Sequence, residues 1–225
     1  MKRIVLINPN TSRVTTAMMT DIARRYLNER FSIEGVTVAR GVPMILDDIQ
    51  LAVAADGVVE LGQDVAGQAD GLIVSAFGDP GLERLRQSIN IPAVGICEAG
   101  MLEASAGSRR FGIATVTPDL VKSFAAKADG LGVSHLFTGT RLTDGDPIKL
   151  ASEPERLLAA LEIAAQECFE RDGAEAVIIG GGPLGEAAAQ LQQHFSAPVI
   201  APIRSAVELL LSKIAHAPQP GAKAG

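Results

Sequence analysis

The chain has 225 residues, of which 47% are hydrophobic and 20% charged, and its formal net charge is -6. This composition is typical of a globular protein with a self-sufficient core, and it excludes a disordered or fibrous chain. The basic residues are scattered, which argues against nucleic acid or an anionic membrane as a partner. No apolar run approaches the roughly 20 residues of a membrane span, so we expect a cytoplasmic protein.

Cysteine and histidine are too dispersed to form a recognisable metal site. Cys97 and Cys168 have no CxxC partner, and His135, His194 and His216 lie far apart in the sequence. In a reducing compartment the two cysteines are expected to be free thiols. The sequence therefore predicts neither a disulfide nor a zinc site.

Short apolar runs alternate with helix-like segments along nearly the whole chain, which predicts an α/β fold with parallel strands covered by helices. The predicted strands are 3–7, 36–39, 71–75, 92–97, 111–115, 134–137, 176–179 and 198–201. The predicted helices are 14–27, 50–65, 82–88, 120–131, 153–171, 184–194 and 205–214.

An internal repeat is the most informative feature of this organisation. Residues 70–95 and 175–201 share one order: an acidic residue, an apolar strand, a loop of small residues, a helix, and a proline before another strand. This alignment pairs Ala76 with Gly181. The pattern indicates a duplicated α/β unit, although any two strand-loop-helix units share some of it.

A weaker repeat pairs the strand end at Asn8 with the strand end at Thr115. We therefore predict two pseudo-symmetric parallel-sheet lobes with flanking helices and an interlobe cleft. Ligands of parallel sheets bind beyond the carboxyl ends of the strands, so the loops at Asn8, Ala76, Thr115 and Gly181 should converge on one pocket. The predicted lobes are residues 1–95 plus 202–215 and residues 96–201, followed by a disordered tail at 216–225.

The loops after the two weaker-repeat strands carry polar side chains. In the first, Asn8, Asn10 and Thr11 precede a helix whose N-terminal N–H groups suit a carboxylate or amide oxygen. Capping and turn formation would favour the same residue types. In the loop after the second strand, the hydroxyl groups of Thr115 and Thr117 could donate hydrogen bonds to a ligand. Helix capping would explain Thr117 but not Thr115.

The loop at 75–81 combines small residues with one aromatic ring and one acid. Ser75 offers a hydroxyl group, Ala76 and Gly78 allow a ligand to approach the backbone, and Phe77 can cover an apolar face. Asp79 precedes a proline, a context more typical of a helix cap than of a base.

The loop at 180–185 can present only backbone at its first positions, because Gly180, Gly181 and Gly182 have no side chains. Such a loop suits an oxyanion hole, and tight packing would favour glycine equally. It is not a dinucleotide-binding fingerprint, because the GxGxxG spacing and the acidic residue about 20 positions further on are missing.

Several motifs together resemble the aspartate/glutamate/hydantoin racemase superfamily, and in particular its hydantoin and allantoin racemase branch. They are LINPNTS at the first strand end, FGDPGL, PAVGICEAG and ATVTP. The resemblance runs from residue 3 to about residue 210. It implies two pseudo-symmetric lobes, no cofactor, a homo-oligomer, and two cysteines on opposite sides of the substrate Cα, one removing its proton and the other returning one.

The chain departs from this superfamily at both cysteine positions. The first maps onto Ala76 and the second onto Gly181, so neither side chain can carry a proton. Cys97 and Cys168 lie elsewhere and are expected to be buried apolar residues. Direct two-thiol proton transfer is therefore excluded, and what the resemblance leaves is a scaffold that binds ligand oxygens.

The leading hypothesis is a cofactor-independent enzyme acting on a small carboxylate, amide or hydantoin-like substrate without cysteine, by hydrolysis or decarboxylation. Glu98 and Asp79 would activate water, and Ser75 would act as a hydroxyl donor or nucleophile. For Glu98, an acid at a helix start is also favourable electrostatically. The alternatives are a racemase that uses other bases and a non-catalytic small-molecule binding module, which ligand-induced stabilisation without turnover would reveal.

Overall fold

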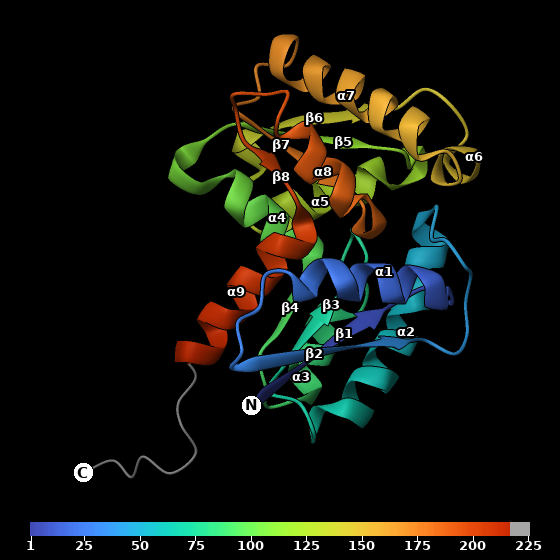
Figure 1. Ribbon diagram of the computed structural model, residues 1–225, viewed down its shortest axis with the longest axis vertical. Coiled ribbons are helices and arrows are strands. Elements are labelled where there is room, and N and C mark those ends of the chain that lie inside the picture. The colour runs from blue at the N-terminus through green and yellow to red at the C-terminus, as the bar shows by residue number, and fades with distance from the viewer. Residues whose placement is uncertain (217–225) are drawn as a thin grey trace.

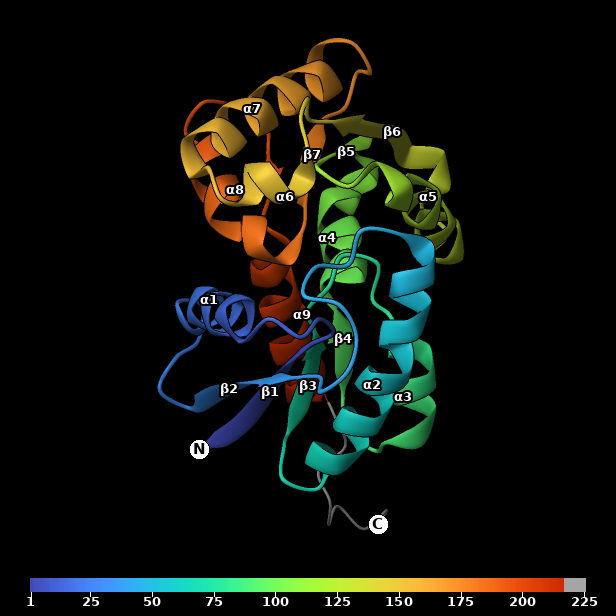
Figure 2. The same cartoon turned by 90° about the vertical axis from the view of Figure 1, so that its right-hand side faces the viewer.

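The computed structural model describes residues 1–216 and contains two four-stranded parallel sheets, one above the other in Figures 1 and 2. The order of the first sheet is β2-β1-β3-β4, and the order of the second is β6-β5-β7-β8. The predicted α/β fold with two equivalent sheets is therefore confirmed. The strands are β1 (Lys2–Asn8), β2 (Phe31–Thr37), β3 (Gly71–Val74), β4 (Ala93–Gly95), β5 (Phe111–Thr115), β6 (Phe137–Leu142), β7 (Ala176–Gly180) and β8 (Val199–Ile200).

The first sheet is buried on both faces because its central strands are continuous apolar runs. Ile4 and Leu6 of β1 face one core cluster, while Val5 and Ile7 face another. One face is covered by α1 (Arg13–Arg24) and α9 (Pro202–His216), and the other by α2 (Asp48–Ala66) and α3 (Leu82–Ser88).

The second sheet has the same layered arrangement. Its outer face is covered by α7 (Pro154–Glu170) and α8 (Gly185–Leu191), and its inner face contacts α4 (Ile96–Ala104) and α5 (Val121–Gly130). A short helix, α6 (Pro147–Ala151), follows β6 and packs against α7.

The two sheets share one hydrophobic core through α4 and α9. These helices pack against each other, and each contacts strands of both sheets. The division into lobes of residues 1–95 plus 202–215 and 96–201 stays a prediction. Of the predicted tail 216–225, His216 is the last residue of α9, and residues 217–225 lie outside the described residues. None of the helices described combines the length and apolar character that crossing a membrane requires.

The predictions of two strands and one strand end were wrong. The predicted strand 36–39 is the end of β2, and residues 134–136 form a 3-10 helix before β6. Both β2 and β6 are edge strands, whose half-exposed faces accept polar residues and lack the apolar run on which the prediction depended. The predicted strand 92–97 ends at Gly95, because Ile96 and Cys97 begin α4.

Candidate functional site

The four loops that were predicted to converge meet at one cavity of about 510 Å³. Their meeting follows from the parallel order of each sheet, which brings the carboxyl ends of neighbouring strands to the same edge. Most of the wall is apolar, and Glu186, which lies 2.8 Å from Arg25, is the one ionisable side chain lining it within residues 1–216.

The predicted site residues divide into two groups. Those that line the cavity are Asn10, Ser75, Ala76, Phe77, Thr117, Gly180, Gly181 and Gly182. Those that do not are Asn8, Thr11, Gly78, Asp79, Glu98 and Thr115. Thr11 donates its backbone N–H to Val42 O at 3.0 Å, which ties the first loop to the chain leading into α2.

Asn8 is fully buried and holds the first loop together rather than facing the cavity. Its amide nitrogen lies 2.8 to 3.0 Å from Asn10 Oδ1, Ser12 O and Thr16 Oγ1, and its Oδ1 accepts from the backbone N–H of Asn10 at 3.1 Å. Ser12 is the N-cap of α1. The expectation of ligand contact at Asn8 is corrected, because every polar atom of this side chain is used inside the turn.

Asn10 presents a hydrogen-bond donor to the cavity. Its Oδ1 accepts from Asn8 Nδ2 at 2.8 Å and from the backbone N–H of Ser12 at 2.9 Å. These two bonds fix the orientation of the amide group, so that Nδ2 is the atom left for a ligand.

Thr117 presents an acceptor from the other lobe. Thr115 is fully buried and donates its hydroxyl hydrogen to Gly180 O at 2.6 Å. The prediction that this hydroxyl group donates to a ligand is therefore corrected. Thr117 Oγ1 lies 3.2 Å from Thr115 Oγ1. Because the hydrogen of Thr115 is already used, Thr117 donates to Thr115 and leaves its lone pairs toward the cavity.

The loop after β3 brings backbone donors to the cavity wall. Ala76 and Phe77 line the cavity, and their N–H groups have no hydrogen-bond acceptor among residues 1–216. Ser75 is 2% exposed, and its hydroxyl group donates a hydrogen bond to Met19 Sδ, with 3.1 Å between Oγ and Sδ. No base contacts this hydroxyl group, so nothing in the described part of the chain activates Ser75 as a nucleophile.

The glycine loop is shaped by close approach of the other lobe. A Cβ atom at Gly180 would lie 2.9 Å from Ile113 Cγ2 of the same sheet and 3.2 Å from the Phe77 ring, and one at Gly182 would lie 2.5 Å from Met19 Sδ. At Gly181 the φ of 160° is extended, and a Cβ there would lie 2.9 Å from Leu184 Cδ1 and 3.0 Å from Leu184 Cγ. All three glycines therefore lie close to neighbouring side chains, and at Gly181 the neighbour belongs to the same loop.

Asp79 caps a helix and does not activate water. Its carboxylate accepts from the backbone N–H groups of Cys97 and Glu98, both at 2.8 Å, at the start of α4. Burial raises the pKa of Asp79, and the Lys127 ammonium at 3.0 Å from Oδ2 opposes that effect. The carboxylate is 0% exposed and outside the cavity, so its predicted catalytic role is corrected.

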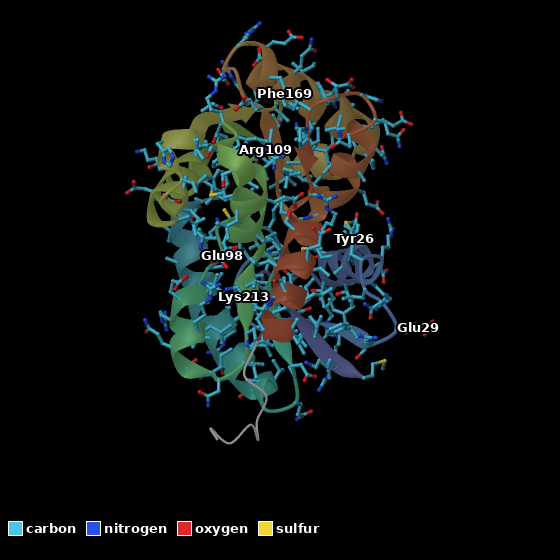
Figure 3. The ribbon with its side chains drawn as sticks, turned by 90° about the vertical axis from the view of Figure 1, so that its left-hand side faces the viewer. Tyr26, Glu29, Glu98, Arg109, Phe169 and Lys213 are labelled. Atoms are coloured by element: carbon cyan, nitrogen blue, oxygen red, sulfur yellow. The ribbon has the colours of Figure 1, made fainter. Side chains whose placement is uncertain are left out.

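Glu98 is also held away from the cavity. It lies near the start of α4 (Figure 3). Arg86 of α3 binds its carboxylate in a bidentate ion pair, with Nη1 at 2.9 Å from Oε2. The residue is 4% exposed. Because this carboxylate is bound by Arg86 and does not line the cavity, it cannot contact a water there, so the predicted role of Glu98 in activating water is corrected as well.

Cys97 and Cys168 are buried free thiols, as predicted, and neither lines the cavity. Burial raises the pKa of Cys97 well above its usual range, and it raises the pKa of Cys168 to about 12. Both are therefore protonated at neutral pH and unsuited to proton abstraction.

The apolar wall is the part of the site that sequence reasoning missed. It comes mainly from one face of α1, from the connection between β2 and α2, and from the start of α7. The run VPMIL at 42–46 could have signalled it, because apolar residues in an irregular segment need a surface to cover. The wall residues include Val14, Met18, Met19, Met44, Ile45, Leu157 and Leu158.

Comparison with known protein families matches residues 4–210 to Asp/Glu/Hydantoin racemase. The chain belongs to this family. It is 26% identical over 215 residues to hydantoin racemase of Paenarthrobacter aurescens, covering 95% of this chain and 91% of that protein. It is 28% identical over 211 residues to hydantoin racemase of Rhizobium meliloti, covering 92% and 86%.

A solved structure supports the same relationship. Allantoin racemase from Klebsiella pneumoniae superposes with a TM-score of 0.90 at 28% identity, covering 100% of this chain and 97% of that one. These relatives of the Asp/Glu/hydantoin racemase family are named as racemases. The expectation of hydrolysis finds no support in them, and the racemase alternative is the better supported one.

Proposed function

We propose that the protein binds a hydantoin-type cyclic amide in the interlobe cavity and promotes its racemisation without a thiol. The observation that carries this proposal is the pairing of a donor, Asn10 Nδ2, with an acceptor, Thr117 Oγ1, on opposite sides of one cavity. A cyclic amide presents a carbonyl oxygen and an N–H group on one rigid ring. Its ring can therefore satisfy both side chains at once, and the apolar wall can take a ring substituent.

Racemisation is the reaction that this set of groups can assist. When the proton on the ring carbon beside the carbonyl leaves, the C–H electron pair moves onto the carbonyl oxygen as an enolate. The N–H groups of Ala76, Phe77, Gly181 and Gly182, which have no acceptor among residues 1–216, would stabilise that oxygen. Each such donor is worth about 10²- to 10³-fold in rate.

The proton itself must be carried by water, because Ala76 and Gly181 stand where the family resemblance predicts thiols. Water accepts the proton on one face of the ring and returns another on the opposite face. The lack of a general base lowers the reaction rate by about 10²- to 10⁴-fold, so we expect slow turnover. Hydrolysis would need an activated nucleophile at the carbonyl carbon, and the candidates Glu98, Asp79 and Ser75 are all engaged elsewhere.

The experiment is deuterium exchange at the ring carbon of L-5-benzylhydantoin, followed together with loss of optical activity. We expect exchange faster than in buffer alone and unaffected by iodoacetamide. Asn10→Ala should slow it, whereas Arg84→Met, which breaks an exposed ion pair with Asp56, is the matched control. Exchange no faster than in buffer would refute the reaction.

A second candidate is binding without turnover. It is favoured because the one ionisable side chain lining the cavity within residues 1–216, Glu186, is paired with Arg25. Stabilisation of the protein by 5-benzylhydantoin with no exchange would establish that candidate in place of the first. The absence of both stabilisation and exchange would contradict the two together.

A further inference from the structure

The ligand-facing loop after β3 is held from the opposite lobe by two side chains of α5. Lys127 Nζ lies 3.0 Å from Asp79 Oδ2, and the Phe124 ring packs edge-on against Phe77 with centroids 5.0 Å apart. Phe124 and Lys127 are one helical turn apart and therefore lie on the same face of α5. Neither residue lines the cavity.

Asp79 links Lys127 to the loop backbone, because its carboxylate binds Lys127 and its backbone N–H binds the loop. Its own N–H donates to Ala76 O at 2.9 Å, closing a tight turn around the residues whose amides face the cavity. Asp79 adopts a positive φ of 50°, a left-handed conformation that a non-glycine residue keeps only when its surroundings hold it. Its carboxylate supplies that restraint by binding α4 and Lys127 together.

The Lys127 side chain is 18% exposed and the Asp79 side chain is fully buried, so the pair is shielded from solvent. If the ammonium group is lost, the carboxylate remains buried with only the two N–H donors of α4. Removing one partner of such a pair is far more disruptive than removing an exposed charge, because the remaining charge is left without its counter-ion. The turn at 76–79 is the segment that can move to relieve this.

We propose that Lys127 is a positioning residue, which acts through Asp79 to hold the amides of Ala76 and Phe77 in their ligand-binding orientation. Lys127 does not line the cavity, and its effect on the ligand is indirect. Ligand affinity thereby depends on a contact between the two lobes. This inference rests on the proposed function for the identity of the ligand, but the restraint on the loop can be measured without a ligand.

The test compares Lys127→Met with Lys122→Met, which removes an exposed lysine from the same helix. Hydrogen exchange of the Asp79 backbone amide, which donates to Ala76 O and closes the turn, is measured on the free proteins, and the Kd of 5-benzylhydantoin is measured by calorimetry. We expect Lys127→Met to speed exchange of this amide and to weaken binding, each by tenfold or more. Lys122→Met should change both by less than twofold, and Lys127→Arg should recover much of the protection.

Two outcomes would overturn the inference. One is unchanged exchange of the Asp79 amide in folded Lys127→Met, and the other is a lower melting temperature with unchanged Kd. If Lys127→Met does not fold, Lys127→Gln gives the same comparison while keeping one donor for Asp79. If the wild-type protein fails to bind 5-benzylhydantoin, the proposed function fails, while the exchange measurement still decides the role of Lys127.

Discussion

Installing thiols at the two positions where the family resemblance predicts them should convert this protein into a fast racemase. The change is Ala76→Cys together with Gly181→Cys. Ala76 already has a Cβ at the cavity wall. At Gly181 a new Cβ would lie 2.9 Å from Leu184 Cδ1 and 3.0 Å from Leu184 Cγ, so the Leu184 side chain must shift, whereas the extended backbone accepts any residue.

The cost in stability should be small and the gain in rate large. Displacing the Leu184 side chain should cost about 1 kcal/mol, or a fall in melting temperature of about 2 to 4 °C for a chain of this size. Each correctly placed acid or base is worth about 10²- to 10⁴-fold. One thiol removes the proton and the other returns one on the opposite face, so both are needed for inversion.

The assay follows deuterium incorporation and optical activity of L-5-benzylhydantoin in parallel. The double variant should exchange and racemise at matching rates, whereas each single variant should incorporate deuterium faster than it loses optical activity. Gly67→Cys, which adds a thiol in open space, controls for stray thiol chemistry. A folded double variant that binds the hydantoin but exchanges no faster than the wild type would show that Ala76 and Gly181 do not flank the reacting carbon.

Three further predictions follow from the contacts around the site. Thr117→Val should weaken 5-benzylhydantoin binding by about 1 to 3 kcal/mol in calorimetry without unfolding the protein, and unchanged affinity would remove Thr117 from the site. Asn8→Ala should lower the melting temperature even without ligand, since it breaks the first loop; normal stability would contradict that role. The folded-state pKa of Cys168, about 12, lies above its usual 9.0, so its stabilising effect is complete below pH 9 and is lost as pH rises toward 12. Urea unfolding over that range should show a loss of about 1.4 kcal/mol per pH unit that is absent in Cys168→Ala, and equal slopes would refute it.

The central strands could be predicted because burial on both faces leaves a continuous apolar run. The predicted strand 111–115 and the predicted helix 82–88 have the bounds of β5 and α3. The edge strands β2 and β6 could not be located in this way, because their exposed sides carry polar residues such as Glu34 and Arg141. Burial decided which predictions succeeded, because β4 and β8 are also edge strands but are buried, and their positions could be predicted.

The loops of the candidate site could be predicted, but the directions of their side chains could not. Asn8 and Asn10 are the same residue type two positions apart, and only the turn between them decides that Asn8 is buried while Asn10 lines the cavity. Similarly, nothing in the sequence pairs Asp79 with Lys127, because that contact depends on how α5 packs across the lobes. The local sequence pattern therefore predicts where a loop lies, whereas tertiary packing determines which of its side chains face the cavity.

Ligand binding and proton transfer are physically separable in this fold. The proposed ligand cradle is made of backbone N–H groups of the loops at 76–77 and 181–182, whose positions depend on the strands, on Asp79 and on the close contact between Phe77 and Gly180. None of these requires a particular side chain at 76 or 181. Proton transfer by thiols, which the family resemblance implies, would by contrast depend entirely on the side chains at those two positions. A chain can therefore lose both thiols and keep the cradle, so a comparison of the wild type with the double cysteine variant would measure the thiol contribution on one unchanged scaffold.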